Sequence, residues 1–206
     1  SPLLVPVFLV AGPILAGPFF GEVRLGLPSP AALLPAAVLA VANAALEETA
    51  YAALMGEHRA AIVFADPPYN VPIEGHASGL GRVRHKDFVM ASGEMSDAEF
   101  TAFLLKTCTL LRDYTREGSL HFICMDWRHA EHLLAAGRTA YAELKNMCVW
   151  DKGVGGMGSL YRSGYELVFV YKQGSGRHRN NVQLGQYGRN RTNVWRYPGS
   201  HSYARS

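Results

Sequence analysis

Charged residues are scarce at the start of this 206-residue chain, where only Glu22 and Arg24 occur among the first 46 residues. The uncharged stretches 1–21 and 25–46 are each long enough to cross a bilayer about 30 Å thick. Prolines interrupt both stretches, however, and each proline removes a helix hydrogen bond. No basic segment precedes the first stretch, as a signal peptide would require. We therefore expect no membrane insertion.

Residues 1–50 are interpreted as an apolar leader rich in proline, glycine and alanine. They lack the alternation of a strand and the caps of a helix, apart from the Ala/Leu-rich stretch Ala36–Ala50, which favours a helix. Composition alone suggests that the leader is extraneous to the rest of the chain. Detecting its peptides in the natural protein by mass spectrometry would refute that hypothesis.

Cysteines are also few. Cys108, Cys124 and Cys148 are odd in number, lack the paired short spacing of a zinc site and sit in apolar runs. They indicate reduced core residues, and we expect a cytoplasmic protein. The histidines between residues 121 and 132 are divided between a predicted strand and a predicted helix, so their convergence on an ion would be fortuitous. We expect no bound metal.

Acidic residues are nearly absent from the C-terminal part. From Lys152 to the end of the chain, nine lysines and arginines accompany one acid, Glu166, which gives this part a charge of +8 and the preceding residues −5. Tyrosines and tryptophans are interleaved with the cations. Cations that contact phosphates and rings that stack on bases are typical of a nucleic-acid-binding surface. A solvated basic tail is the alternative.

The rest of the chain has the pattern of one α/β domain, residues 51–206, with a single core. Ser96 and Glu99 form a capping box that begins a helix, for which Gly118 is a plausible terminator, and a second helix is expected from Trp127 to Ala136, ending near Gly137. Strands are expected at Ala61–Ala65, Leu120–Met125, Leu144–Trp150 and Tyr165–Tyr171. This alternation predicts a partial Rossmann-like fold with a mostly parallel sheet and helices on both faces.

The residues that suit catalysis follow the first of these strands. The tetrapeptide Asp66-Pro67-Pro68-Tyr69, which we call the acceptor motif, begins where the strand ends, and α/β sheets bind ligands beyond the carboxyl ends of their strands. The Asp66 carboxylate and the Pro67 carbonyl can accept hydrogen bonds from an amino group, and the fixed φ of proline holds them stiffly. Tyr69 offers a ring face for an extruded base.

The chain resembles the DNA methylases of the N-4 cytosine/N-6 adenine group, in the class whose catalytic tetrapeptide precedes the cofactor motif. The likeness extends from about Tyr51 to Tyr197. It is carried by the segments Ala65–Val71, Gly118–Trp127, Cys148–Lys152 and Tyr161–Lys172.

The resemblance implies a methyltransferase fold, S-adenosyl-L-methionine as cofactor and DNA as partner. It further implies that Asp66 and Pro67 bind the target amine, that Pro68 completes the motif and that Tyr69 stacks on the flipped base. Aspartate at the head of the motif is similar to the adenine-specific members, so N6 of adenine is the expected target.

The cofactor motif of that family is missing. No F-x-G-x-G segment occurs before Ser206, and the glycines between Gly153 and Gly158 lead into a strand instead of the helix that a dinucleotide fingerprint requires. We therefore expect a truncated enzyme with weak or absent turnover. Asp66 and Asn70 remain the candidate cofactor contacts. The strand Ala61–Ala65 is expected to present an apolar edge, which the leader covers or which leaves the chain unstable.

DNA contacts are expected in the loop after the acceptor motif and in the basic part, at Arg82, Arg84, His85, Arg162, Arg177, Arg179, Arg189 and Arg191. Trp127 and Trp150 are interpreted as core aromatics. Two other functions stay open: methylation of RNA or of a protein amide, and non-catalytic DNA binding by a remnant without the cofactor loop. The recognition sequence and the oligomeric state have no signal in the sequence.

Overall fold

The computed structural model describes residues 7–10, 38–39, 48–71, 91, 93–153, 155 and 160–197. The strands are β1 (Val7–Val10), β2 (Val38–Leu39), β3 (Ala60–Asp66), β4 (Thr115–Met125), β5 (Glu143–Asp151), β6 (Tyr165–Lys172) and β7 (Val194–Arg196). The helices are α2 (Glu48–Met55), α3 (Asp97–Asp113) and α4 (Ala130–Ala140).

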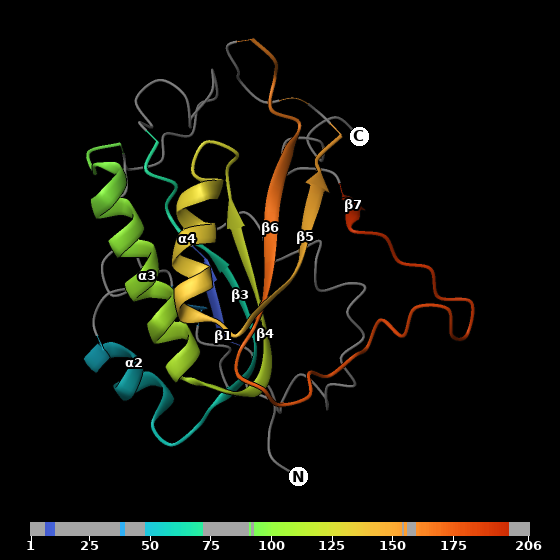
Figure 1. Ribbon diagram of the computed structural model, residues 1–206, viewed down its shortest axis with the longest axis horizontal. Helices are drawn as coiled ribbons and strands as arrows, with labels where there is room; N and C mark the ends of the chain where they lie inside the picture. Colours follow the sequence, from blue (N-terminus) through green and yellow to red (C-terminus); the bar gives the residue numbers. More distant parts are fainter. Residues whose placement is uncertain are drawn as a thin grey trace.

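The strands form one sheet in the order β2-β1-β3-β4-β6-β5-β7 (Figure 1). Strand β6 runs antiparallel to both of its neighbours, β4 and β5, whereas the other neighbouring pairs are parallel. This arrangement confirms the predicted α/β fold with a mostly parallel sheet. It also brings the start of β6 to the edge of the sheet where β3 and β4 end.

Helices α3 and α4 pack against each other on one face of the sheet. The main core lies beneath them and includes Phe100, Leu104, Leu133, Ile123 and Phe169. Because side chains alternate along a strand, Cys124 of β4 and Val168 and Val170 of β6 point to the opposite face, where they form a second cluster with Cys148 of β5. The three cysteines are buried and free, which confirms their predicted place in the core.

Two strands of the sheet come from the leader. Strand β1 pairs in parallel with β3, with Val10 level with Asp66, and β2 pairs with β1 on its other side. The apolar edge of β3 is therefore covered by the leader, which was one of the two predicted outcomes. The predicted helix at Ala36–Ala50 is wrong at Val38 and Leu39, which pair with β1, whereas the last residues of that stretch belong to α2 (Glu48–Met55). None of the described helices is long and apolar enough to cross a membrane.

Helix α3 begins as predicted, because the Ser96 and Glu99 side chains each accept a hydrogen bond from the other's backbone N–H. Gly118 does not end it. The helix stops at Asp113, and Gly118 lies inside β4 with φ +76°, where a side chain would overlap the backbone of Arg177. Glycine at position 118 therefore allows β4 and the segment after β6 to approach each other closely.

Helix α4 continues past Gly137 to Ala140, which corrects the predicted end. Gly137 faces the ring of Tyr171 on β6 so closely that a methyl group there would overlap it. The Tyr171 hydroxyl donates a hydrogen bond to the carbonyl of Leu133 at 3.1 Å. Here glycine lets the helix sit directly on the sheet.

A buried histidine in the middle of β4 makes stability depend on pH. His121 is 0% exposed, and its ring nitrogens lie 2.9 Å from the Tyr141 hydroxyl, 3.0 Å from that of Ser119 and 3.1 Å from that of Thr115. Burial lowers the pKa of His121 to about 3. Since the unfolded chain has a histidine pKa of about 6.5, only the unfolded state takes up this proton between about pH 6.5 and pH 3.

We therefore expect the His121 contribution to the free energy of unfolding to fall by about 2 kcal/mol between pH 7 and pH 5. Urea unfolding of the wild type and of His121→Gln at both pH values measures it as the difference between their pH dependences. Identical pH dependences would contradict the prediction.

Candidate active site

The acceptor motif lies at the carboxyl end of β3. Asp66 is the last residue of the strand, and Pro67 and Pro68, which follow it, are buried. The Tyr69 hydroxyl donates a hydrogen bond to Oδ1 of Asp66 at 2.6 Å. The same hydroxyl lies 3.2 Å from Oε2 of Glu166. The motif thus places an aromatic ring beside a carboxylate at the end of a strand.

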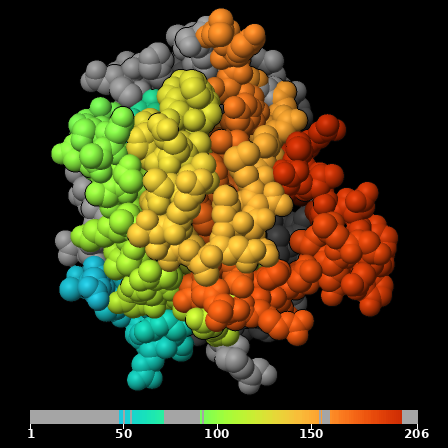
Figure 2. All heavy atoms as spheres, viewed as in Figure 1, coloured from blue at the N-terminus to red at the C-terminus, as the bar shows by residue number. Residues whose placement is uncertain are grey.

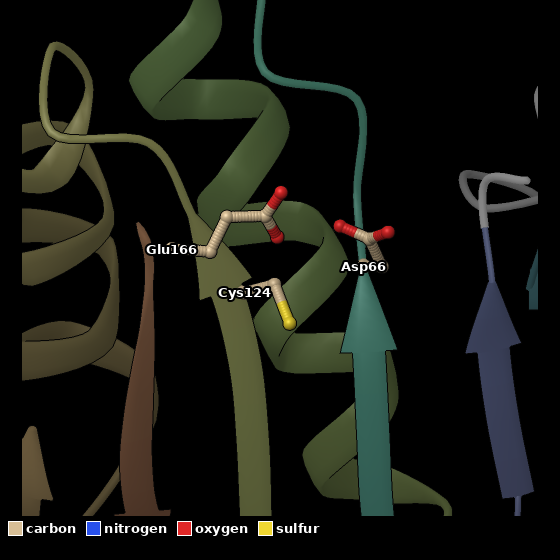
Figure 3. A group of neighbouring side chains, drawn as sticks. All are labelled: Asp66, Cys124 and Glu166. Carbon is tan, nitrogen blue, oxygen red and sulfur yellow. The ribbon is translucent and has the colours of Figure 1, made fainter. Parts of the chain in front are cut away.

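Three neighbouring strands contribute side chains to this place. Figure 3 shows Asp66 from β3, Cys124 from β4 and Glu166 from β6 directed toward one another. One carboxyl oxygen of each acid and the sulfur of Cys124 lie within 4.8 Å of one another. Lys152, the residue after β5, forms an ion pair with Oε1 of Glu166. We call Asp66, Tyr69, Glu166 and Lys152 the carboxylate cluster.

The surroundings of Asp66 favour its protonated form. Burial is the largest cause that raises the pKa of Asp66, to about 7, and the negative charge of Glu166 raises it further. The hydrogen bond from Tyr69 and the positive charge of Lys152 act in the opposite direction. Burial also raises the pKa of Tyr69 and that of Cys124 well above their ordinary values. At neutral pH the phenol and the thiol are neutral, while Asp66 lies near its midpoint.

Because folding raises the pKa of Asp66, ionisation of this carboxyl at alkaline pH destabilises the native state. We therefore expect Asp66→Asn to stabilise the fold at alkaline pH. A carboxyl whose pKa is raised on folding stabilises the native state below its unfolded pKa of about 3.9, and this stability is lost as pH rises through about 7. We expect the stability gained by Asp66→Asn to be larger at pH 8 than at pH 5 by about 2.5 kcal/mol. Thermal unfolding at both pH values measures it, and an equal gain at both would contradict it.

Asp66, Cys124 and Glu166 are also residue types that bind metal ions. The ammonium group of Lys152 already pairs with Glu166, however. A cysteine binds metal as the thiolate, whereas burial keeps Cys124 as the thiol. The chemistry of these donors therefore fits a proton-binding group better than a cation site, and the absence of a metal stays a prediction.

Asn70 fixes the acceptor motif to the segment before α3. It is 7% exposed, and its Nδ2 donates to the carbonyl of Met95 at 2.8 Å. Its Oδ1 accepts from the N–H groups of Gly93 at 3.0 Å and Met95 at 3.2 Å. Asn70 also has a φ of 53°, in the left-handed region. The structure gives Asn70 a structural role, and its predicted cofactor contact stays a prediction.

The predicted DNA-binding residues fall into separate groups. Arg82, Arg84 and His85 lie outside the described residues. Arg162 is exposed and precedes β6, at the sheet edge that carries Asp66. Arg177 and Arg179 follow β6 and are exposed at the opposite edge. The structure therefore brings Arg162 toward the acceptor motif and separates these two arginines from it.

Arg189 and Arg191 are exposed in the segment that joins β6 to β7. This segment projects at the side of the molecule in Figures 1 and 2. The guanidinium of Arg189 lies 5.7 Å from the centre of the Tyr187 ring, which is itself 85% exposed. Arg189, Arg191 and Tyr187, three of the cations and rings that the sequence predicted for a nucleic-acid surface, thus lie on an accessible segment.

The two tryptophans that were predicted in the core differ. Trp150 is 3% exposed and its Nε1 donates to the carbonyl of Tyr197 at 2.9 Å, which confirms the prediction. Trp127 is 56% exposed, so that prediction is wrong. Strand β4 ends at Met125, and the following turn leaves Trp127 at the surface, with the Arg128 guanidinium 4.9 Å from the ring centre.

Sequence reasoning missed Glu166, Lys152 and Cys124 as neighbours of Asp66. Cys124 was interpreted only as a core residue, and Glu166 only as the one acid of a basic region. The position of Glu166 could have indicated a partner, because an acid at the start of a buried strand costs free energy unless it is paired. The chain separation between Asp66 and Glu166 left no local pattern to connect them.

Neither a family model nor a curated protein matches the sequence. The fold is similar to solved structures of a candidate DNA modification methylase from Thermus thermophilus. One shares 16% identity over 74% of this chain and 66% of that chain, with a TM-score of 0.45. A second shares 14% over 72% and 65%, with a TM-score of 0.46. A third, complexed with S-adenosyl-L-methionine, shares 15% over 74% and 65%, with a TM-score of 0.43. This chain spans about two thirds of the length of these proteins.

Proposed function

We propose that this protein transfers a methyl group from S-adenosyl-L-methionine to an exocyclic amino group of a flipped DNA base, with N6 of adenine as the target. The observation that carries the proposal is the acceptor motif at the carboxyl end of β3. There the carboxyl group of Asp66 and the carbonyl of Pro67 follow one another at the sheet edge, beside the ring of Tyr69. The ordered resemblance of segments 65–71, 118–127, 148–152 and 161–172 to the N-4 cytosine/N-6 adenine methylases supports it.

The residue types match the chemistry of an aromatic amine. Its lone pair is delocalised into the ring, so the amine attacks only when acceptors hold its N–H groups in a pyramidal geometry. Asp66 would accept one N–H and the Pro67 carbonyl the other, in partly buried surroundings where hydrogen bonds to a charged acceptor are strong. The cofactor supplies a methyl group activated by its bond to a sulfonium.

The edge that carries Asp66 also fits an adenosyl group. Strands β1 and β3 are parallel and Val10 lies level with Asp66, so the carboxyl ends of two neighbouring strands meet there. Nucleotide cofactors of α/β proteins bind in such positions. Among the described residues that were candidates, Asp66 keeps a side chain directed into this edge, whereas the amide of Asn70 bonds to backbone groups.

The distribution of positive charge supports DNA as the partner. Arg162 lies at the edge of Asp66, and Arg189 and Arg191 lie on the projecting segment before β7. Phosphate contacts of this kind position a duplex without reading its sequence. Extrusion of one base from the stack would bring its amine to the acceptor motif.

Two measurements on the full chain test the proposal. Calorimetric titration with S-adenosyl-L-methionine is expected to show saturable binding, and tritium transfer from the labelled cofactor is expected to label duplex DNA. Chromatography of the digested product would show N6-methyladenine, while N4-methylcytosine would correct the base. Label on RNA or protein instead of DNA would move the activity to another substrate class. DNA binding without cofactor binding would identify a non-catalytic protein.

A further inference from the structure

Two residues of opposite charge lie next to the acceptor motif without belonging to it. Glu166 places Oε2 within 3.2 Å of the hydroxyl through which Tyr69 also bonds Asp66. Its other oxygen, Oε1, pairs with the ammonium of Lys152. The order of groups is therefore Asp66, Tyr69, Glu166 and Lys152, with each in contact with the next.

Backbone pairing fixes this order. Glu166 lies opposite Trp150 in the β5–β6 ladder, and the backbone N–H of Lys152 donates to the carbonyl of Gly164 at 2.9 Å. The strands β4 and β6 are paired from Leu120–Lys172 to Met125–Leu167, which sets the height of Glu166 against the end of β4. Glu166 is thus held within the sheet, and Lys152 is held by a backbone hydrogen bond directly beyond its edge.

We propose that Glu166 and Lys152 are positioning residues that set the charge of Asp66, with Glu166 favouring the carboxylic acid and Lys152 favouring the carboxylate. The role of this charge in methyl transfer rests on the proposed function. The charge control itself rests on the contacts between these side chains.

The other described groups that face Asp66 carry no charge that would shift its pKa. In the described part of the chain, Tyr69 and Cys124 are the other titratable neighbours, and burial keeps both neutral at physiological pH. They contribute a hydrogen bond and apolar contact respectively, and neither carries charge. Among the residues that the structure describes, Glu166 and Lys152 are therefore the charged groups that act on Asp66.

Such control suits the proposed reaction. As the nitrogen forms its bond to the methyl carbon, the carbon–sulfur bond breaks and sulfur keeps the electron pair. The methylated nitrogen then carries a positive charge and must lose one proton. Asp66 as carboxylate can accept that proton and release it to solvent after the product leaves. Glu166 makes Asp66 a stronger proton acceptor, and Lys152 favours its ionised form before the reaction.

The test is a titration of the Asp66 carboxyl carbon by ¹³C NMR on the full chain, with the signal assigned by its loss in Asp66→Asn. We expect Glu166→Gln to lower the pKa of Asp66 and Lys152→Met to raise it, each by about one pH unit. Lys152→Arg should restore the wild-type titration. Opposite shifts are a signature that a merely structural role for the pair would not produce.

Glu143→Gln is the matched control, because Glu143 is an exposed acid at the other end of β5. We expect it to leave the titration of Asp66 unchanged. Shifts of both variants in one direction, or no shift in either, would overturn the proposal. If Glu166→Gln fails to fold, Lys152→Met decides alone, because an unchanged or lowered pKa in that variant contradicts the proposal.

The titration does not depend on turnover, so its outcome can be separated from that of the proposed function. Opposite shifts in a protein that neither binds the cofactor nor methylates DNA would sink the methyltransferase proposal and keep the charge control. If the protein methylates DNA but the pKa of Asp66 is the same in both variants, the methyltransferase proposal stands and the charge control is excluded.

Discussion

Asp66→Ala is expected to lower methyl transfer to DNA by at least about 100-fold, because it removes an acceptor that orients and activates the target amine. The carbonyl of Pro67 would then be the one acceptor left in the motif, and the methylated nitrogen would lose its nearest proton acceptor. Tritium transfer measured in a single turnover, with enzyme in excess over DNA, detects this loss even where wild-type turnover is weak.

Two further variants make the Asp66 result specific. Asp66→Asn keeps one acceptor oxygen and removes the base, so its rate should lie between those of the wild type and Asp66→Ala. Asp113→Ala removes an exposed carboxylate at the end of α3 and should leave the rate unchanged. Wild-type rates in Asp66→Ala would exclude the acceptor motif as the site of the chemistry.

Asn70→Ala is expected to destabilise the fold by about 3–5 kcal/mol, which corresponds to a fall in Tm of about 10 °C. The change removes three hydrogen bonds to the backbone of Gly93 and Met95 and leaves alanine at a φ of 53°. Buried N–H and carbonyl groups that lose their partners carry the full cost of desolvation. Thermal unfolding followed by circular dichroism measures the effect.

Asn180→Ala is the matched control for this prediction. Oδ1 of Asn180 also accepts two backbone hydrogen bonds, from Val182 and Gln183, but in an exposed turn where water replaces them. We expect a loss below about 1 kcal/mol there. Equal losses at the two asparagines would show that burial of the Asn70 contacts is unimportant.

The parts of the fold that the sequence predicted are those determined by local pattern. The apolar runs of β3, β4 and β6, the capping box of α3 and its buried face follow from side-chain periodicity and from hydrogen bonds between near neighbours. The acceptor motif was found for the same reason, because a strand that stops at two prolines is visible in a few residues.

The parts that could not be predicted depend on which segments meet in three dimensions. Glycine at Gly118 and Gly137 was interpreted as a helix terminator, whereas both positions admit a close approach by β6 or by the chain that follows it. The leader lacks periodicity, so nothing in it indicated that Val7–Val10 would pair with β3. The pairing of Glu166 with Asp66 similarly depends on the insertion of β6 between β4 and β5.

Because β6 runs antiparallel to its neighbours, its two ends lie at opposite edges of the sheet. Its first residues supply Glu166 to the cluster, and its last residue, Lys172, leads into the exposed segment with Arg177 and Arg179 at the far edge. Residues 180–191 lie beyond the contacts that Gly176 and Arg177 make with β4, so we expect insertions or deletions there to leave the ladder between β4 and β6 in register and Glu166 in place. The exposed segment between β6 and β7 can therefore change in length and charge while the carboxylate cluster stays the same.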